Sequence, residues 1–405
     1  MLDLTNFNWE KYVGRRQPPL RGELALRGVL EWFKDHGFER DFSHLYIYFS
    51  RPTADKGIIS DHYISLELKN QAVKDFENKI KNNIDYAYRF LDDLANKTKQ
   101  LDEFSRGLEA KKDFTSQELP DLFSEFCRQW QDFGPNLYIF LLVSEAVENI
   151  ILQKHIDDQT ARTKLLKQVS SQARSEFFEE NDLKSFTDSQ ENFFDPSDPY
   201  IQLLVALTEY RDKRKIVYED SWYKYSDKFF QALERQIGLG DKLGFVSSAN
   251  IAKILRGGDM GFELEFPSIV YAQNGEIKFE YGAKVKELQD KIQRSTIDFK
   301  GELKGNAANA GLARGKVRLV EPHVANQEFL DGEILVTRMT TPDLMPLIRR
   351  AAAIVTDEGG ITCHAAIVSR ELDVPCIIGA KYATQVFQTG DLIEVNANRG
   401  IVRKK

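Results

Sequence analysis

The sequence predicts an α+β protein of two domains. Residues 1–300 form a largely helical domain with a small β-hairpin region, and residues 301–405 form a domain in which strands and a helix alternate. Three observations lead to this prediction. Apolar residues recur mostly at intervals of three and four in several stretches between residues 73 and 233, which is the period of amphipathic helices. An Asn-Gly pair then joins two strand-like runs. Short apolar runs and glycine-rich loops alternate in the C-terminal part.

Length and composition exclude several classes of protein. The chain has 405 residues, of which 42% are hydrophobic and 29% are charged, as expected for a globular protein of two or three domains. The net charge of −7 gives no general reason to expect nucleic acid as a partner. The first ten residues, MLDLTNFNWE, lack the basic and then apolar pattern of a secretory signal. The longest apolar run, residues 137–143, is too short to span a bilayer. We therefore expect a cytoplasmic protein without a membrane partner.

The three cysteines are Cys127, Cys363 and Cys376. They show neither CxxC spacing nor a paired framework, so we expect reduced thiols.

Helical patterns dominate the N-terminal domain. Residues 23–34 form the first predicted helix, whereas residues 46–49 fit either a short strand or part of a helix. The apolar stripe over residues 73–108 predicts one long amphipathic helix or two helices in line.

The next helix begins with a capping box formed by Thr115 and Glu118. Gly134 and Pro135 are expected to end it. Residues 137–155 then form a third helical stretch.

Aromatic residues are dense in the following helical stretch, residues 201–233. They fit either a pocket for a flat, apolar substrate or an ordinary core, and core is the default.

Glu145 and Glu148 lie one turn apart on the preceding helical stretch. No histidine adds the spacing typical of a metal site, so a solvated helix face is favoured over a catalytic or metal-binding pair. The glycine-rich run 256–261 lacks the GK[ST] ending of a phosphate-binding loop, which favours a turn.

Strand-like runs come next, at residues 262–266, 269–272 and 276–280, and the Asn-Gly pair predicts a hairpin between the last two. Residues 296–311 are rich in glycine and small side chains. We interpret them as a linker that permits rigid-body movement of the C-terminal domain.

The strongest functional signal lies in residues 356–379, TDEGGITCHAAIVSRELDVPCIIG. Two runs typical of buried strands, 351–355 and 375–378, flank it. An acidic, glycine-rich loop, 357–360, leads to a helical segment that opens at His364. Unpaired N–H groups and the helix dipole stabilise an anion at such a position. A neutral imidazole is also a good nucleophile, so a phosphoryl group on this histidine would be well held.

Neighbouring residues suit the same chemistry. Gly359 and Gly360 remove side chains where the backbone must approach a ligand, and Thr362 is of a type that caps a helix. Ala365 and Ala366 leave room on the first turn for the active site of a partner.

Two more residues of the motif, Cys363 and Arg370, each allow two interpretations of their role. Cys363 adjoins the histidine, but a small side chain at a helix junction explains it better than a nucleophile does. Arg370 fits either a contact with phosphate or a structural salt bridge. The other five histidines are scattered and are interpreted as surface or core residues.

The motif GGITCHAAIVSR, from Gly359 to Arg370, closely resembles the phosphohistidine signature of the PEP-utilising enzymes. This family includes phosphoenolpyruvate synthase, pyruvate phosphate dikinase and rifampin phosphotransferase. The resemblance continues through ordered motifs: AGLARGKV from residue 310, ILV from 334, TPD from 341, PCIIG from 375 and GD from 390.

The resemblance implies that residues 301–405 fold as a β/β/α swivelling phosphohistidine domain. His364 would be the nucleophile and the phosphoryl carrier. The residues that would position the phosphoryl group are Thr362, Gly359, Gly360, Cys363, Ala365 and Arg370.

Enzymes of this family also need an ATP-grasp module and a module for the final acceptor or donor. We find no ATP-grasp pattern and no PEP-binding barrel in this sequence, and the domain order resembles that of rifampin phosphotransferase. We therefore expect a phosphotransferase subunit that binds no cofactor itself. A separate ATP-grasp protein of the PEP/pyruvate-binding type would use ATP and Mg²⁺, and a small-molecule acceptor would bind the helical domain.

Two alternatives stay open. In the first, the chain is a phosphoenolpyruvate synthase-like subunit of a split enzyme. In the second, it is a non-enzymatic regulatory or interaction protein that uses the phosphohistidine as a switch.

Overall fold

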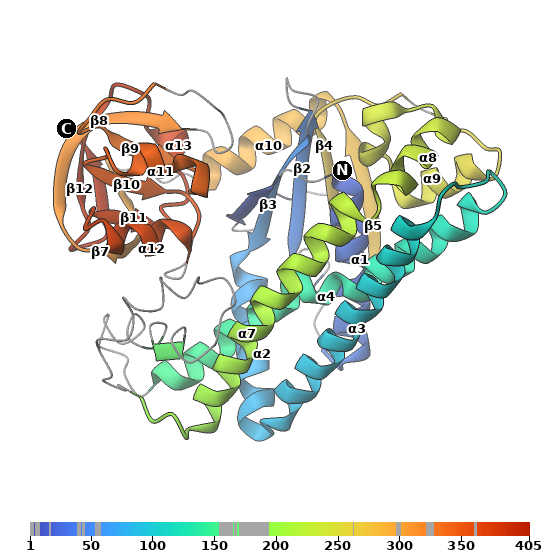
Figure 1. Cartoon of the computed structure of the whole chain (residues 1–405), viewed down its shortest axis with the longest axis horizontal. Coiled ribbons are helices and arrows are strands. Elements are labelled where there is room, and N and C mark those ends of the chain that lie inside the picture. Colours follow the sequence, from blue (N-terminus) through green and yellow to red (C-terminus); the bar gives the residue numbers. More distant parts are fainter. Residues whose placement is uncertain are drawn as a thin grey trace. The chain divides into compact units, whose positions relative to one another are not determined.

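The fold is taken from a computed structural model of the chain (Figure 1). The structure describes residues 4, 9–15, 18–38, 42, 45–52, 58–153, 165, 168–169, 194–261, 263–296, 301–320, 328–359 and 363–405. The chain divides into two compact units, Met1–Gln293 and Arg294–Lys405. Each unit combines helices with a β-sheet, as the α+β prediction states.

The sheet of the N-terminal unit has five antiparallel strands in the order β1-β3-β2-β4-β5. The strands are β1 (Trp9–Arg15), β2 (Tyr46–Pro52), β3 (Ile58–Ser65), β4 (Ser268–Gln273) and β5 (Glu276–Tyr281). The predicted hairpin is β4–β5, and its turn residues Asn274 and Gly275 have φ angles of 52° and 76°. It is the edge of a sheet that is larger than the sequence predicts. Among residues 262–266, those that the structure describes, 263–266, form no strand.

The helices of this unit pack on both faces of the sheet. They are α1 (Pro19–Asp35), α2 (Leu66–Asn82), α3 (Asp85–Ala110), α4 (Leu119–Leu152), α7 (Pro199–Glu219), α8 (Asp227–Ile237), α9 (Ser248–Leu255) and α10 (Ala283–Thr296), with a π-helix at Asp220–Lys224 and a 3-10 helix at Gly240–Phe245. Tyr46 and Tyr48 pack with α1, α2, α3, α4 and α7, whereas Ile47 and Phe49 face α10. This alternation follows from the two-residue period of a strand.

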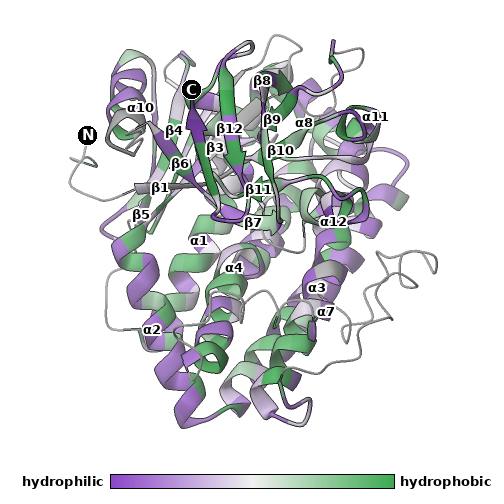
Figure 2. Cartoon of the chain, turned by 90° about the vertical axis from the view of Figure 1, so that its left-hand side faces the viewer, coloured by the Kyte–Doolittle hydropathy of each residue, from purple (hydrophilic) through white to green (hydrophobic). Residues whose placement is uncertain are grey.

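The apolar stripe over residues 73–108 belongs to two helices, α2 and α3. Asn83, with φ −156° and ψ 103°, is extended and separates them, so one continuous helix is wrong. Both helices are amphipathic, and Figure 2 shows hydrophilic and hydrophobic residues alternating along them.

Helix α4 continues through Gly134 and Pro135, where the sequence predicts its end. A proline lacks the N–H that would bond the carbonyl four residues earlier, here that of Gln131. A Cβ at Gly28 of α1 would overlap this carbonyl oxygen, and a Cβ at Gly134 would overlap the carbonyl oxygen of Ala25. The two glycines let α1 and α4 approach closely, and burial at this contact offsets the cost of the proline.

Helix α4 is also, among the residues that the structure describes, the one helix long and apolar enough to cross a membrane. More than half of its most apolar window is buried inside the protein. Its buried side chains belong to the two hydrophobic clusters of the N-terminal unit, as expected for a central core helix.

The C-terminal unit is built on one eight-stranded sheet in the order β6-β13-β12-β8-β9-β10-β11-β7. Strands β8 to β11 pair in parallel, and the outer pairs are antiparallel. The strands are β6 (Glu302–Lys304), β7 (Asn306–Asn309), β8 (Leu312–Val320), β9 (Ile334–Thr337), β10 (Ala353–Thr356), β11 (Cys376–Ile378), β12 (Leu392–Asn396) and β13 (Ile401–Lys404). The helices are α11 (Met345–Ile348), α12 (His364–Glu371) and α13 (Ala383–Val386), with a 3-10 turn at Pro342–Leu344.

The predicted linker, residues 296–311, is mostly part of this sheet. Strands β6 and β7 lie within it and pair with β13 and β11. The Gly305 N–H donates to the Gly400 carbonyl at 2.9 Å, and the Gly311 N–H donates to Asn398 Oδ1 at 3.0 Å. The prediction of a flexible linker is therefore wrong for residues 302–309. A small residue is needed in this segment because the backbones of neighbouring strands come close. A Cβ at Gly305, for example, would lie 2.8 Å from the carbonyl oxygen of Ile378. Residues 297–300 lie outside the described residues.

Candidate functional site

His364 is the first residue of α12, which connects the parallel strands β10 and β11. A parallel pair needs a crossover connection, and here a loop and a short helix provide it. Cys363 precedes the helix with φ −75° and ψ 162°, an extended conformation. The imidazole therefore stands at the start of the helix that follows the C-terminal end of strand β10.

The imidazole is half-buried and held by a neighbouring loop. Its Nδ1 lies 2.9 Å from the hydroxyl oxygen of Thr340, a residue that is only 6% exposed. Burial lowers the pKa of His364 from its usual value, and the nearby charge of Asp343 opposes this effect. The ring is thus neutral near pH 7, with a lone pair available for nucleophilic attack.

The sequence analysis did not predict a role for Thr340, which lies 24 residues before His364 in the chain. Thr340 follows β9, and β9 pairs directly with β10, so the sheet brings its hydroxyl to the histidine loop. The neighbouring Thr-Pro-Asp motif at residues 341–343 was the available signal.

The N-terminus of α12 places backbone amides that have no partner within the helix beside the imidazole. The first backbone bond of the helix runs from the Ile367 N–H to the Cys363 carbonyl at 3.1 Å, so the amides of His364, Ala365 and Ala366 precede it. The methyl groups of Ala365 and Ala366 are buried in the core of the unit. They pack inward instead of leaving room for a partner, but their amides still favour an anion at this end.

The structure places only some of the predicted positioning residues. Gly359 has φ 126°, and a Cβ there would lie 2.8 Å from Cys363 Sγ, so only glycine fits. Gly360 and Thr362 lie outside the described residues. The residue at the N-cap position is Cys363, not Thr362, and its side chain makes no cap hydrogen bond.

Cys363 and Arg370 flank the histidine on the same helix. Burial raises the pKa of the Cys363 thiol, and the amides of Ala366 and Ala365 partly offset this rise. A protonated thiol is a poor nucleophile, in agreement with a structural role. Arg370 Nε donates to the Ala366 carbonyl at 2.7 Å, and burial lowers its pKa. Arg370 thus binds to the backbone of its own helix.

A buried aspartate supports the loop before the histidine. Asp357 is 5% exposed; its carboxylate accepts the Thr384 N–H at 3.0 Å and the Thr384 hydroxyl. The Thr356 hydroxyl donates to the Glu358 carbonyl at 2.6 Å. The two bonds to Thr384 hold Asp357 against α13.

Metal ligands do not cluster in the part of the chain that the structure describes: no three histidine, cysteine or acidic side chains gather in a way that would hold an ion. Glu145, one of the paired glutamates on α4, forms an ion pair with Lys69, Nζ to Oε2 2.9 Å. The solvated-face interpretation fits this contact. The three cysteines are free thiols.

Residues 329–400 match the family described as PEP-utilising enzyme, mobile domain. The C-terminal unit carries a PEP-utilising enzyme mobile domain. The match contains β9 to β12 of this mobile domain, together with His364, Thr340 and Asp343.

Curated relatives resemble the same part of the chain. A probable phosphoenolpyruvate synthase from Archaeoglobus fulgidus is 49% identical over 117 residues, which cover 29% of this chain and 15% of the relative. The phosphoenolpyruvate synthase of Pyrococcus furiosus is 50% identical over 102 residues, which cover 25% of this chain and 12% of the relative. The similarity thus spans less than a fifth of either relative and is a similarity of one domain.

One solved structure overlaps a larger share of the chain. A solution structure of Enzyme I covers 73% of this chain and 82% of its own, at 12% identity and a TM-score of 0.20. A TM-score this low supports no conclusion about fold or function.

Proposed function

We propose that this protein is a phosphotransferase subunit whose mobile domain carries a phosphoryl group on His364. One observation carries the proposal. A half-buried imidazole with a lowered pKa stands at the first position of a helix, with Nδ1 2.9 Å from a buried threonine hydroxyl. The family match for the same domain supports it.

The Thr340 contact favours Nε2 as the atom that is phosphorylated. When Nδ1 keeps its proton and donates to the Thr340 oxygen, the lone pair of the neutral ring is on Nε2. Attack by this lone pair forms an N–P bond, and the P–O bond to the leaving group breaks with its electron pair on the leaving oxygen. The amides at the start of α12 then stabilise the added negative charge.

The donor in this proposal is a separate ATP-grasp protein, which would supply ATP and Mg²⁺ chemistry at its own site. The acceptor would be a small molecule bound to the helical N-terminal unit. Domain order supports this arrangement, because a largely helical unit precedes the mobile domain, as in rifampin phosphotransferase.

A phosphoenolpyruvate synthase-like reaction is the second candidate. The observation that favours it is the 49–50% identity between the mobile domain and proteins named phosphoenolpyruvate synthase. In that case a barrel-containing partner and pyruvate would discharge the phosphohistidine.

The test is transfer of label to the purified chain from ATP labelled separately at the β and γ positions, and from labelled phosphoenolpyruvate, with and without lysate of its source cells. Phosphohistidine is scored as acid-labile, base-stable phosphate. Label from β-labelled ATP that requires lysate would support the first candidate. Label from phosphoenolpyruvate, discharged by pyruvate, would support the second. If the lysate phosphorylates a control carrier but this chain takes up no label, both candidates are wrong.

The Thr340→Val substitution is expected to slow labelling about tenfold, because a lost hydrogen bond of about 1–1.5 kcal/mol no longer orients the imidazole. The initial rate of labelling measures this effect. The Thr340→Ser variant keeps the hydroxyl and should recover most of the rate. Equal rates for valine and serine variants would show that the hydroxyl has no role in transfer.

The Asp343→Asn substitution is expected to lower the pKa of His364 further. Burial already lowers this pKa, and the negative charge of Asp343 is the effect that raises it, so removing the charge leaves burial unopposed. The neutral, nucleophilic ring then persists to lower pH. An NMR titration of the His364 ring measures the shift.

The control for this titration is Asp373→Asn. Asp373 follows the other end of α12 and has φ 52°, a conformation that asparagine adopts well. It should leave the His364 titration unchanged. A raised pKa in Asp343→Asn would contradict the assigned electrostatics.

A further inference from the structure

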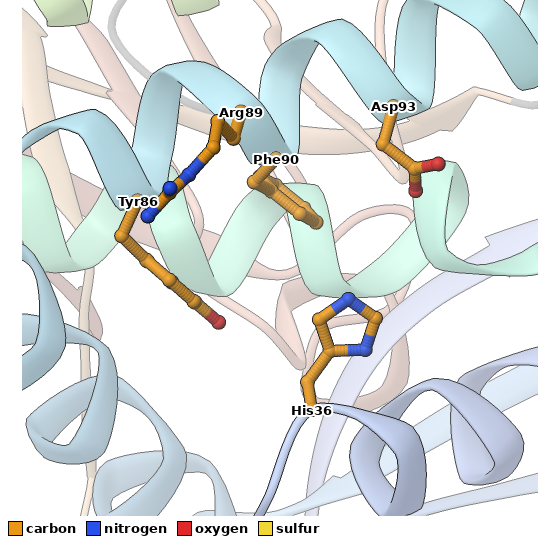
Figure 3. Close-up of a pocket in the computed structure, with 5 residues that line it drawn as sticks. All are labelled: His36, Tyr86, Arg89, Phe90 and Asp93. Carbon is orange, nitrogen blue, oxygen red and sulfur yellow. The ribbon is translucent and has the colours of Figure 1, made fainter.

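A hollow on the N-terminal unit shows no excess of either charge. The side chains that line it are His36, Tyr86, Arg89, Phe90 and Asp93 (Figure 3). The exposed guanidinium of Arg89 is matched by the carboxylate of Asp93, and the Tyr86 hydroxyl is buried. A charged group better suited to hold a ligand is an arginine of the C-terminal unit, beside the loop that leads to His364.

Arg338 follows β9 and lies next to the acidic loop. The pairing of β9 with β10 continues past both strands, because the Glu358 N–H donates to the Arg338 carbonyl at 2.9 Å. The Asp357 N–H likewise donates to the Thr337 carbonyl at 3.1 Å. These bonds place Arg338 and Glu358 side by side, and Arg338 Nε lies 3.7 Å from Glu358 Oε1.

This contact is an ion pair without a hydrogen bond, since 3.7 Å is beyond hydrogen-bond range. Arg338 Nε is buried and has no hydrogen-bond partner, whereas the two Nη groups are open to solvent and the side chain as a whole is 21% exposed. A guanidinium has five N–H donors in a fork that matches the oxygens of carboxylate and phosphate groups. The pairing with Glu358 therefore leaves donors of Arg338 for a further anion.

The ion pair lies close to the histidine. Thr340, two residues after Arg338, has its hydroxyl oxygen 2.9 Å from His364 Nδ1. On the side of the glutamate, Gly359 packs on Cys363, because a Cβ at Gly359 would lie 2.8 Å from the cysteine sulfur. Each end of the ion pair is thus within two residues of a contact with the start of α12.

A phosphoryl group would add about two negative charges where carboxylates already lie. Asp343 acts on the imidazole of His364, and Glu358 belongs to the loop before it. Asp357 is buried and bound to Thr384. A dianion on the imidazole is repelled by these charges unless a cation offsets them.

The cations at this end of the sheet differ in what holds them. Arg370 Nε donates to the Ala366 carbonyl of its own helix at 2.7 Å. Lys381 follows β11, on the side of β10 away from β9. Arg338 belongs to the same segment as Thr340 and is held by the loose ion pair. Arg338 is therefore the cation best placed to turn toward a phosphoryl group.

We propose that Arg338 leaves Glu358 and binds the phosphoryl oxygens when His364 is phosphorylated. The Nη groups donate to these oxygens in the bidentate geometry that arginine forms with phosphate. Glu358 competes with the phosphoryl group for the guanidinium and so keeps that group transferable. The inference rests on the proposed function, because it needs a phosphoryl group on His364.

Competition predicts opposite effects of two substitutions. Loss of a phosphoryl group passes through a loose, metaphosphate-like transition state, in which its oxygens carry less charge than in the phosphohistidine. A cation on these oxygens therefore slows the loss. Arg338→Gln should shorten the half-life of the phosphohistidine about three- to tenfold, and Glu358→Gln should lengthen it by a similar factor. If the pair only holds the loop, both substitutions break the same contact and change the half-life in the same direction.

A double variant separates direct contact from long-range electrostatics. When Arg338 is already glutamine, Glu358→Gln has no guanidinium to release and should no longer lengthen the half-life. Through-space repulsion alone would make the two effects additive. Arg338→Lys keeps the charge but lacks the fork, so its half-life should lie between those of the wild type and Arg338→Gln.

The experiment phosphorylates the full chain with phosphoramidate, which transfers its phosphoryl group to histidine without an enzyme and releases ammonia. The ³¹P NMR resonance that is absent from His364→Asn is followed as it decays at fixed pH. In the wild type, the Arg338 Nε–H cross peak, identified by its absence from Arg338→Lys, should shift on phosphorylation. This second readout does not depend on how well a variant folds.

Arg350→Gln is the control. Arg350 Nε donates to Asp331 Oδ1 at 2.5 Å near the N-terminal end of β9, away from Arg338, so this variant should keep the wild-type half-life. If phosphoramidate leaves His364 unlabelled, the proposed function fails together with this inference. If His364 is labelled, the role of Arg338 alone is overturned by an unshifted cross peak, by equal half-lives of Arg338→Gln and the wild type, or by additive effects in the double variant.

Discussion

The His364→Asn variant is expected to take up no measurable phosphoryl group from any donor that labels the wild-type chain. Asparagine offers an amide, which has no lone pair able to attack phosphorus, at the position where the imidazole stands. No neighbouring group replaces it: Cys363 is the adjacent thiol, and burial raises its pKa. The effect on labelling is therefore a complete loss and not a slower rate.

Asparagine is the replacement of choice because it leaves the rest of the site in place. The side chain at residue 364 is half-buried and its main polar contact is with the Thr340 hydroxyl, which an amide also bonds. We expect a change in the free energy of unfolding of less than about 1 kcal/mol. Circular dichroism and urea denaturation of the unlabelled variant measure this.

His323→Asn is the control, because His323 is the other histidine of the C-terminal unit. It should be labelled as fast as the wild-type chain. Acid-labile label that survives in His364→Asn and is lost in His323→Asn would move the carrier role to His323. Label that survives in both variants would place it outside these two residues.

The Gly28→Ala variant is expected to lose at least about 3 kcal/mol of stability, or to fail to fold. A Cβ at this position would overlap the Gln131 carbonyl oxygen of α4. Because backbone lies on both sides of the contact, no side-chain rotation relieves it, and α1 and α4 must separate. These two helices carry much of the core of the N-terminal unit. The urea midpoint of the full chain, followed by far-UV circular dichroism, measures the loss.

Gly107→Ala is the matched control for this prediction. Gly107 is exposed in the interior of α3, and a Cβ there meets nothing within 4 Å. The same substitution should therefore raise stability by about 0.5–1 kcal/mol, since alanine is the better helix former. Similar losses for the two variants would mean that helix propensity, and not the α1–α4 contact, decides the effect.

Local signals in the sequence predicted local structure well. The Asn-Gly pair at residues 274–275 predicted a hairpin, because both residues readily take the positive φ angles that the turn needs. The apolar period of three and four predicted the helices of the N-terminal unit, and the runs around His364 predicted β10, α12 and β11. In each case residues close in the chain determine the outcome.

The errors arose where distant segments meet. The predicted helix end at Gly134 and Pro135 is wrong because the contact with Gly28, far away in the sequence, offsets the cost of the proline. The predicted linker is largely part of a sheet, because β6 and β7 pair with strands from the C-terminal end of the chain. A glycine-rich composition is typical of linkers and of tight strand packing alike.

The sequence by itself determined that a histidine stands at the start of a helix between two buried strands, and that its motif is that of the PEP-utilising enzymes. Only the tertiary structure decided which groups surround that histidine. Thr340 and Asp343 follow β9, and they reach His364 because β9 pairs with β10 in the sheet. The partners of a side chain depend on which strands are neighbours, and strand neighbours are chosen by packing across the whole domain, which no local pattern records.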